Sequence, residues 1–138
     1  MKNRVETKSI NEYGDVAIRA VEKIRSGTVD SPRAAWNEAA REVFPGRIHR
    51  QQKGCPRGAF LGLCDEGLVR DVPAGSYSRS IDNKAYALRA VELLREAPEL
   101  ATKGRRTLWN RVEAKAASHN SQMDVVLALH HNGLLKTG

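Results

Sequence analysis

Cysteine is the scarcest informative residue in this sequence. Only two cysteines, Cys55 and Cys64, occur in 138 residues. They are nine positions apart in what we predict to be one helix, where a rotation of about 100° per residue places them on opposite faces. We therefore expect both thiols to stay reduced and apart, which is typical of a cytoplasmic protein.

Long hydrophobic runs are absent as well. The most apolar segments, residues 58–64 and 125–129, are far shorter than the roughly 20 residues that a membrane-spanning helix requires. The first ten residues, MKNRVETKSI, are charged throughout and lack the apolar centre of an export signal. These absences predict a cytoplasmic location and no membrane partner.

The sequence also lacks the residue patterns of the common enzyme classes. It has no glycine-rich phosphate loop, no paired catalytic carboxylates and no Ser/His/Asp order. The cysteine spacing matches no zinc pattern, and the adjacent His130 and His131 point about 100° apart on a helix. Cys55 lies between Lys53 and Arg57 and is a candidate reactive thiolate. We favour the simpler interpretation that Cys55 is a residue at the start of a helix, with no reactivity. We predict a protein that is not an enzyme and that uses no cofactor or metal.

What the sequence does contain is an ordinary globular composition with an excess of positive charge. Hydrophobic residues make up 41% of the chain and charged residues 28%, close to globular averages, and the length suits a single domain, 1–138. Lysine and arginine outnumber aspartate and glutamate by 23 to 16, which gives a net charge of +7. A cationic surface attracts nucleic acid, anionic lipid heads or acidic proteins.

Three sequence blocks occur twice in the same order. The paired blocks are 17–25 with 87–95 (AIRAVEKIR and ALRAVELLR), 33–37 with 106–110 (RAAWN and RTLWN), and 55–69 with 121–135. The spacing between partners differs from block to block, as insertions in connecting loops would produce. We interpret the pattern as an ancient duplication, in which residues 9–69 form one unit and residues 81–135 form the other.

The first unit is predicted to contain three helices. Ser9, followed three residues later by a glutamate, forms a capping-box pattern at the start of the first helix. Ser31 and Pro32 mark the start of the second helix. The third helix begins at Pro56 and ends at Gly67, which can adopt the left-handed conformation of a C-terminal cap.

The second unit repeats this plan. Asp82 starts its first helix, and the next helix carries Trp109 on its apolar face. Ser121 and Asp124 form a second capping box before the last helix, which ends at Gly133.

Residues 70–80 join the two units. They contain Pro73 and Gly75 but do not alternate in polarity, so we predict a connector rather than a wing-like hairpin. Helical faces this small and alanine-rich are marginal as separate three-helix domains. The prediction is therefore an all-α fold, in which two tandem three-helix units related by a pseudo-two-fold axis share one core.

Three segments of the sequence resemble a known family. They are KGCPRGAFLGLCDEGLV at 53–69, HNSQMDVVLALHHNGL at 119–134, and the repeated AVE helices. The chain resembles a family of small bacterial proteins described only as a domain of unknown function, over most of its length. The resemblance implies a bacterial, cytoplasmic protein of a kind encoded by stand-alone genes in mobile gene cassettes, and it implies no chemistry.

The repeated Trp-Asn pairs are the most distinctive residues of the two units. Tryptophans at equivalent positions can line a ligand pocket, but they are more often core anchors, and each asparagine then bonds a nearby backbone group or cap. We assign structural roles to Trp36, Asn37, Trp109, Asn110, Gly67 and Gly133.

Two clusters of cations flank the approach to the third helix of each unit. In a helix-turn-helix the third helix enters the major groove and flanking cations neutralise phosphates, so both clusters are candidate polyanion-binding sites that should converge on one face. The long connection 44–55 and the acidic Asp124 depart from that pattern. The candidates are Arg47, Arg50, Lys53 and Arg57 in the first cluster, and Lys103, Arg105, Arg106, Arg111 and Lys115 in the second.

Three functions from different classes remain. We rank first a small non-enzymatic interaction or structural module, whose partner is another protein or a second copy of the chain. A nucleic-acid-binding module is second, and a small-ligand-binding domain is third. Exposed apolar residues would favour the first function, a continuous positive face the second, and a polar-lined cavity the third.

Overall fold

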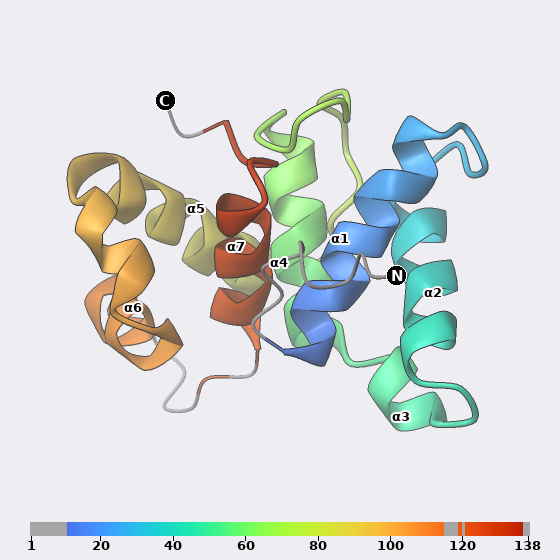
Figure 1. Ribbon diagram of the computed structural model, residues 1–138, viewed down its shortest axis with the longest axis horizontal. Coiled ribbons are helices and arrows are strands. Elements are labelled where there is room, and N and C mark those ends of the chain that lie inside the picture. The colour runs from blue at the N-terminus through green and yellow to red at the C-terminus, as the bar shows by residue number, and fades with distance from the viewer. Residues whose placement is uncertain (1–10, 115–118, 120, 137–138) are drawn as a thin grey trace, which may run out of the picture.

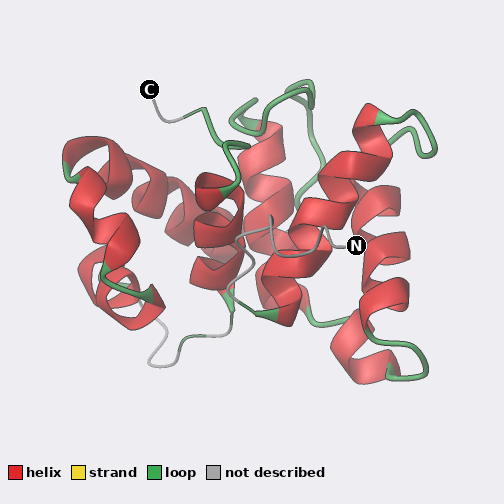
Figure 2. Ribbon diagram, viewed as in Figure 1, coloured by secondary structure: helices red, strands yellow, loops and turns green. Residues whose placement is uncertain are grey.

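The computed structural model describes residues 11–114, 119 and 121–136 (Figure 1). All regular elements in this part of the chain are helices (Figure 2), and one isolated antiparallel bridge joins Val69 to Leu135. The prediction of an all-α protein is therefore confirmed. The elements are α1 (Glu12–Arg25), α2 (Pro32–Val43), α3 (Ile48–Gln51), α4 (Gly54–Asp65), α5 (Ile81–Glu96), the 3-10 helix η2 (Pro98–Thr102), α6 (Arg105–Val112) and α7 (Gln122–His131).

Helices α1 and α2 both start at a side-chain cap. The Ser31 hydroxyl accepts a hydrogen bond from the Ala34 N–H at 3.1 Å, and Pro32 is the first residue of α2, as predicted. Ser9 lies outside the described residues. The side chain that caps α1 is that of Asn11, which accepts hydrogen bonds from the N–H groups of Tyr13 and Gly14.

Two predicted helix starts and one predicted capping box were wrong. Helix α4 begins at Gly54 rather than Pro56, and α5 begins one residue after its cap, Ser80, rather than at Asp82. Ser121 precedes α7 but has a left-handed φ of 70° and makes no capping hydrogen bond. Its expected capping-box partner, Asp124, instead forms a buried ion pair with Arg105.

Helices α4 and α7 pack against each other at the centre of the molecule, and the remaining helices surround them (Figure 1). Helix α1 packs on α2 and α7, whereas α5 packs on α4, α6 and α7. The buried apolar side chains of these helices form one hydrophobic cluster within the described residues. Its largest fully buried members include Trp36, Phe60, Leu63, Leu108, Met123, Leu127 and Leu129.

Helices α4 and α5 approach each other unusually closely because α4 carries glycine on the facing side. A Cβ atom on Gly62 would lie 2.7 Å from the Cα of Lys84, and one on Gly58 would lie 2.9 Å from the Cβ of Ser80. Neither position therefore tolerates a side chain without moving α5. The close packing brings the N-terminal end of α5 directly against the first turns of α4.

Helices α4 and α7 end in the same way. Gly67 and Gly133 have φ values of 70° and 71°, the left-handed conformation that glycine adopts without strain. The chain segments that follow then exchange hydrogen bonds, since the Arg70 N–H donates to the Leu134 carbonyl and the Lys136 N–H to the Leu68 carbonyl, both at 2.8 Å. None of the described helices combines the length and apolarity that crossing a membrane requires.

Candidate anion-binding site

The two tryptophans of the Trp-Asn pairs are buried in the core, as predicted. Trp36 is fully buried with its ring 5.3 Å from that of Phe60, and the buried Trp109 packs edge-on against Tyr86 at 5.3 Å. The asparagines differ from each other. Asn37 accepts a hydrogen bond from Arg57, whereas Asn110 is exposed.

Two of the four cations of the first predicted cluster, Arg50 and Lys53, make contacts near the start of α1. Arg50 forms an ion pair with Glu12 at 3.2 Å and lies over the Phe44 ring, and Lys53 lies over the Tyr13 ring at 5.5 Å. These contacts hold the short helix α3 against the start of α1. Arg47 is exposed at the start of α3.

In the second cluster, one cation has a structural partner. Nη1 of Arg105 lies 3.0 Å from both carboxylate oxygens of Asp124, whose side chain is completely buried and also accepts a 2.6 Å hydrogen bond from Asn11. This pair ties α6 and the start of α1 to the first turn of α7. Lys103, Arg106 and Arg111 are exposed, and Lys115 lies outside the described residues.

One cation of each cluster, Lys53 and Arg105, acts on the same histidine, His119. Nε2 of His119 accepts a hydrogen bond from the Met123 N–H at 3.0 Å. Burial lowers the pKa of His119, Asp124 opposes this lowering, and the positive charges of Arg105 and Lys53 add to it. The other cations on α3 and α6 lie apart, because these two helices stand at opposite sides of the view in Figure 1.

A different group of cations gathers in one place. Arg33, Gly54, Arg57, Gly58, Leu61, Arg79 and Ser80 line a cavity of about 170 Å³. Arg57 also lines a second cavity of about 140 Å³, together with Asn37, Arg41, Gln51 and Gln52. We call the two cavities the arginine groove and its four cations, Arg33, Arg41, Arg57 and Arg79, the groove arginines. No acidic side chain lines either cavity, and none of the groove arginines forms an ion pair within the described part of the chain.

The groove arginines belong to three elements of the fold. Helix α2 supplies Arg33 and Arg41, α4 supplies Arg57, and the connector before α5 supplies Arg79. The connector is held in place by Asp65, which accepts hydrogen bonds from the N–H groups of Tyr77 and Ser78. Arg33 adds a 2.7 Å hydrogen bond to the Tyr77 carbonyl.

Like charges lie close together in the groove. Burial lowers the pKa of Arg33, and the positive charges of Arg79 and Arg57 lower it further, while the carboxylate of Asp65 opposes them. The protein thus concentrates guanidinium groups without neutralising them. Repulsion among such groups is relieved when an anion binds between them.

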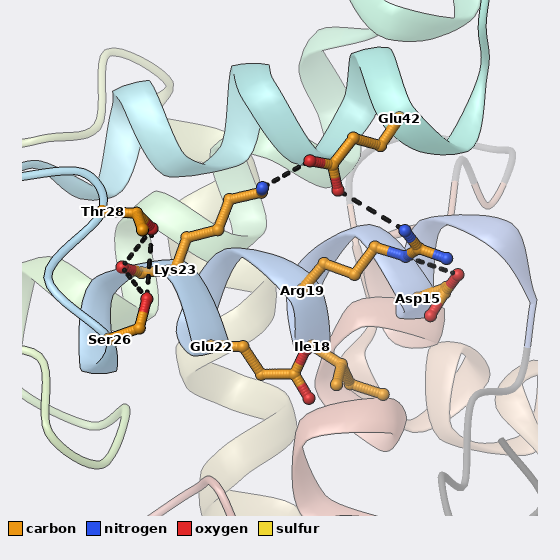
Figure 3. Close-up of a pocket in the computed structure, with 8 residues that line it drawn as sticks. All are labelled: Asp15, Ile18, Arg19, Glu22, Lys23, Ser26, Thr28 and Glu42. Carbon is orange, nitrogen blue, oxygen red and sulfur yellow. Dashed lines mark hydrogen bonds and ion pairs between the residues drawn. The ribbon is translucent and has the colours of Figure 1, made fainter. Parts of the chain in front are cut away.

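A groove between α1 and α2 has the opposite character (Figure 3). It is an open cavity of about 430 Å³ in which cations and carboxylates pair with each other. Glu42 of α2 accepts from both Lys23 and Arg19 of α1, and Arg19 also pairs with Asp15 at 3.1 Å. These ion pairs join the two helices, so we assign this groove a structural role.

Neither cysteine forms a disulfide. Cys64 is fully buried, and burial raises the pKa of its thiol, which makes it inert at neutral pH. Cys55 is half-buried in the first turn of α4. Within the described residues, no three side chains of histidine, cysteine, aspartate or glutamate gather in a way that could hold a metal ion.

Arg33, Arg41 and Arg79 were missed by the sequence analysis. Arg33 carried a usable signal, because it opens the repeated RAAWN block. Arg41 and Arg79 carried none, since only the packing of α2 and the connector around α4 brings them beside Arg57. In the sequence, Arg57 stands among the cations of the first cluster, whereas in the fold it lies beside arginines 16 to 24 positions away.

Comparison with known proteins gives one match. No curated protein and no solved structure matches the chain. One protein family, described as a family of unknown function (DUF6979), matches residues 10–136. Since this match spans nearly the whole chain, the protein belongs to that family of unknown function.

Proposed function

We propose that this protein is a non-enzymatic module that binds nucleic acid through the phosphates of its backbone, at the arginine groove. The observation that carries the proposal is the convergence of Arg33, Arg41, Arg57 and Arg79 in two adjoining cavities without an acidic lining residue. Arginine binds phosphate in a bidentate manner, and backbone contacts of this kind supply most of the affinity of non-specific nucleic-acid binding.

The other two ranked functions have less support. An interaction module needs an apolar patch, but the only exposed large hydrophobic side chains among the described residues are Ile48 and Ile81, at the starts of separate helices. A small-ligand domain needs an enclosed, largely apolar cavity. The cavities here are open, and charged or polar residues dominate the lining of the arginine groove.

We also infer that the fold arose by duplication, with units at 9–69 and 81–135 joined by the connector 70–80. The packing of α1 on α7 and of α5 on α4 supports this, because each pair joins the first helix of one unit to the last helix of the other. The reciprocal hydrogen bonds after Gly67 and Gly133 also support it. A pseudo-two-fold axis between the two units would account for both observations.

A bacterial, cytoplasmic setting, with genes carried on mobile cassettes, remains part of the proposal. Its support is the resemblance noted in the sequence and the two free cysteines, of which one is fully buried.

The test is titration of fluorescent duplex and single-stranded oligonucleotides at several salt concentrations. If all four groove arginines contact phosphates of a duplex, affinity should fall on the order of 100-fold between 50 and 200 mM salt. Replacing Arg57 and Arg79 together by glutamine should reduce the slope of log affinity against log salt by about two.

A matched variant removes the same charge elsewhere. Arg47→Ala combined with Arg50→Ala takes two cations from α3, outside the groove, and should leave the slope nearly unchanged. If wild type fails to bind either oligonucleotide at low micromolar concentration in low salt, nucleic-acid binding is refuted. If only the α3 variant loses affinity, the groove is refuted as the binding surface.

A further inference from the structure

We propose that the first cavity of the arginine groove binds a terminal phosphomonoester, such as the 5′-phosphate of a nucleic-acid strand. The inference rests on the proposed function and specifies which part of the nucleic acid the groove recognises. Arg33, Arg57 and Arg79 surround this cavity, and Ser80 lines it as well.

Three arginines from three different elements suit a phosphomonoester. A phosphate at a chain end carries close to two negative charges at neutral pH and three terminal oxygens, one more of each than an internal phosphodiester. The three arginines come from α2, α4 and the connector, so they can approach the three oxygens from different directions. An internal phosphodiester has only two free oxygens to offer them.

The fold keeps these three side chains available. Arg79 is exposed and makes no side-chain hydrogen bond or ion pair within the described residues, and Arg57 donates only to the neutral Asn37 amide. Arg33 donates one hydrogen bond to the Tyr77 carbonyl. This bond fixes the position of the Arg33 side chain and leaves its other N–H groups for a ligand. The uncapped start of α4 borders the same cavity through Gly54.

The two cavities of the groove can hold a chain end and the strand that follows it. The first cavity, of about 170 Å³, has room for one phosphoryl group. The apolar Leu61 and the close contact of Gly58 with Ser80 and Asn83 border the cavity where α4 and α5 meet. The second cavity, beyond Arg57, offers Arg41 and the amides of Asn37, Gln51 and Gln52 to the next part of the strand.

The experiment compares two oligonucleotides that differ only in one group. A single strand of twelve nucleotides, labelled at its 3′ end, is prepared with a 5′-phosphate or a 5′-hydroxyl, and binding is followed by fluorescence anisotropy. We expect the phosphorylated strand to bind at least about tenfold more tightly, the effect of one charge-assisted hydrogen bond. The preference should shrink at pH 5, because the second ionisation of a phosphomonoester has a pKa near 6.

Arg79→Gln should abolish the preference for the 5′-phosphate, and far-UV circular dichroism should show that it stays folded, since Arg79 contributes no described side-chain contact. Arg57→Gln provides a second test with the same expected loss. Arg70→Gln is the matched control. It removes an exposed arginine that lies beyond the C-terminal end of α4 and lines neither cavity of the groove, and it should keep the preference.

The outcomes separate the inference from the proposed function. If both oligonucleotides bind equally well, the phosphomonoester site is refuted while nucleic-acid binding stands, and if neither binds, the proposed function fails as well. Inorganic phosphate and a nucleoside 5′-monophosphate serve as competitors. If either competes as effectively as the phosphorylated strand, a nucleic-acid end is refuted as the ligand.

Discussion

Arg105 was predicted from the sequence to contact a polyanion, but its ion pair with Asp124 gives it a role that can be measured without any ligand. The side chain of Arg105 is about half exposed, whereas that of Asp124 has no exposed surface. A buried carboxylate is stable only when its charge is compensated. We therefore expect Arg105→Gln to destabilise the protein.

The magnitude follows from what remains around Asp124 after the change. Removing one partner of a buried ion pair costs about 3 to 5 kcal/mol. Asn11 still donates to Asp124, and the start of α7 favours a negative charge at this position, so the cost should lie near the lower end, at about 3 kcal/mol. In a chain of this size, that loss lowers the melting temperature by roughly 10 °C.

Urea and thermal unfolding of three variants test this reasoning. Arg106→Gln removes the neighbouring exposed arginine and should change the free energy of unfolding by less than about 0.5 kcal/mol. Combining Arg105→Gln with Asp124→Asn removes both charges and should recover at least half of the loss. A change below about 1 kcal/mol in Arg105→Gln would show that the ion pair contributes little and would return Arg105 to the candidate ligand contacts.

Three further predictions concern packing and pH. Gly62→Ala should destabilise the protein by about 1 to 3 kcal/mol, since its Cβ would meet the Lys84 backbone, while Gly54→Ala, with open space around it, should be neutral or stabilising in the same denaturation assay. The pKa of His119 is lowered in the folded state, so the unfolded state binds more protons below about pH 6.5. Stability should therefore fall as the pH drops through that range. His119→Asn should weaken this dependence in urea titrations at about pH 7 and pH 5. Trp36→Ala should cost about 3 to 5 kcal/mol, and an unchanged melting temperature would contradict its role as a core anchor.

Helix positions were predictable from sequence because apolar spacing and caps are local. Ser31 and Pro32 start α2 as expected, and Gly67 and Gly133 end their helices in the left-handed conformation. Ser121 was wrong as a cap because the chain reaches α7 with a left-handed residue. That geometry depends on how α7 packs, which no local pattern encodes.

The candidate site was much less predictable. The density of cations along the chain pointed to Arg57, but it pointed equally to Arg50 and Arg105. Both of these arginines form ion pairs in the fold. Whether a cation is available for a ligand depends on the carboxylates that folding brings beside it. Glu12 and Asp124 neutralise those two arginines from 38 and 19 positions away, respectively.

The link between core and groove explains why only one of the two proposed units carries the site. Trp36 of α2 packs against Phe60 of α4 and so holds the two helices together. The next residue of α2, Asn37, accepts a hydrogen bond from Arg57 of α4 and orients that side chain. In the aligned block of the second unit, the position of Arg57 is taken by Met123, which is fully buried in the core. Asn110 therefore has no arginine to orient, and it is exposed. Under the proposed duplication, both units keep the tryptophan for packing, whereas only the first has an arginine at this helix position.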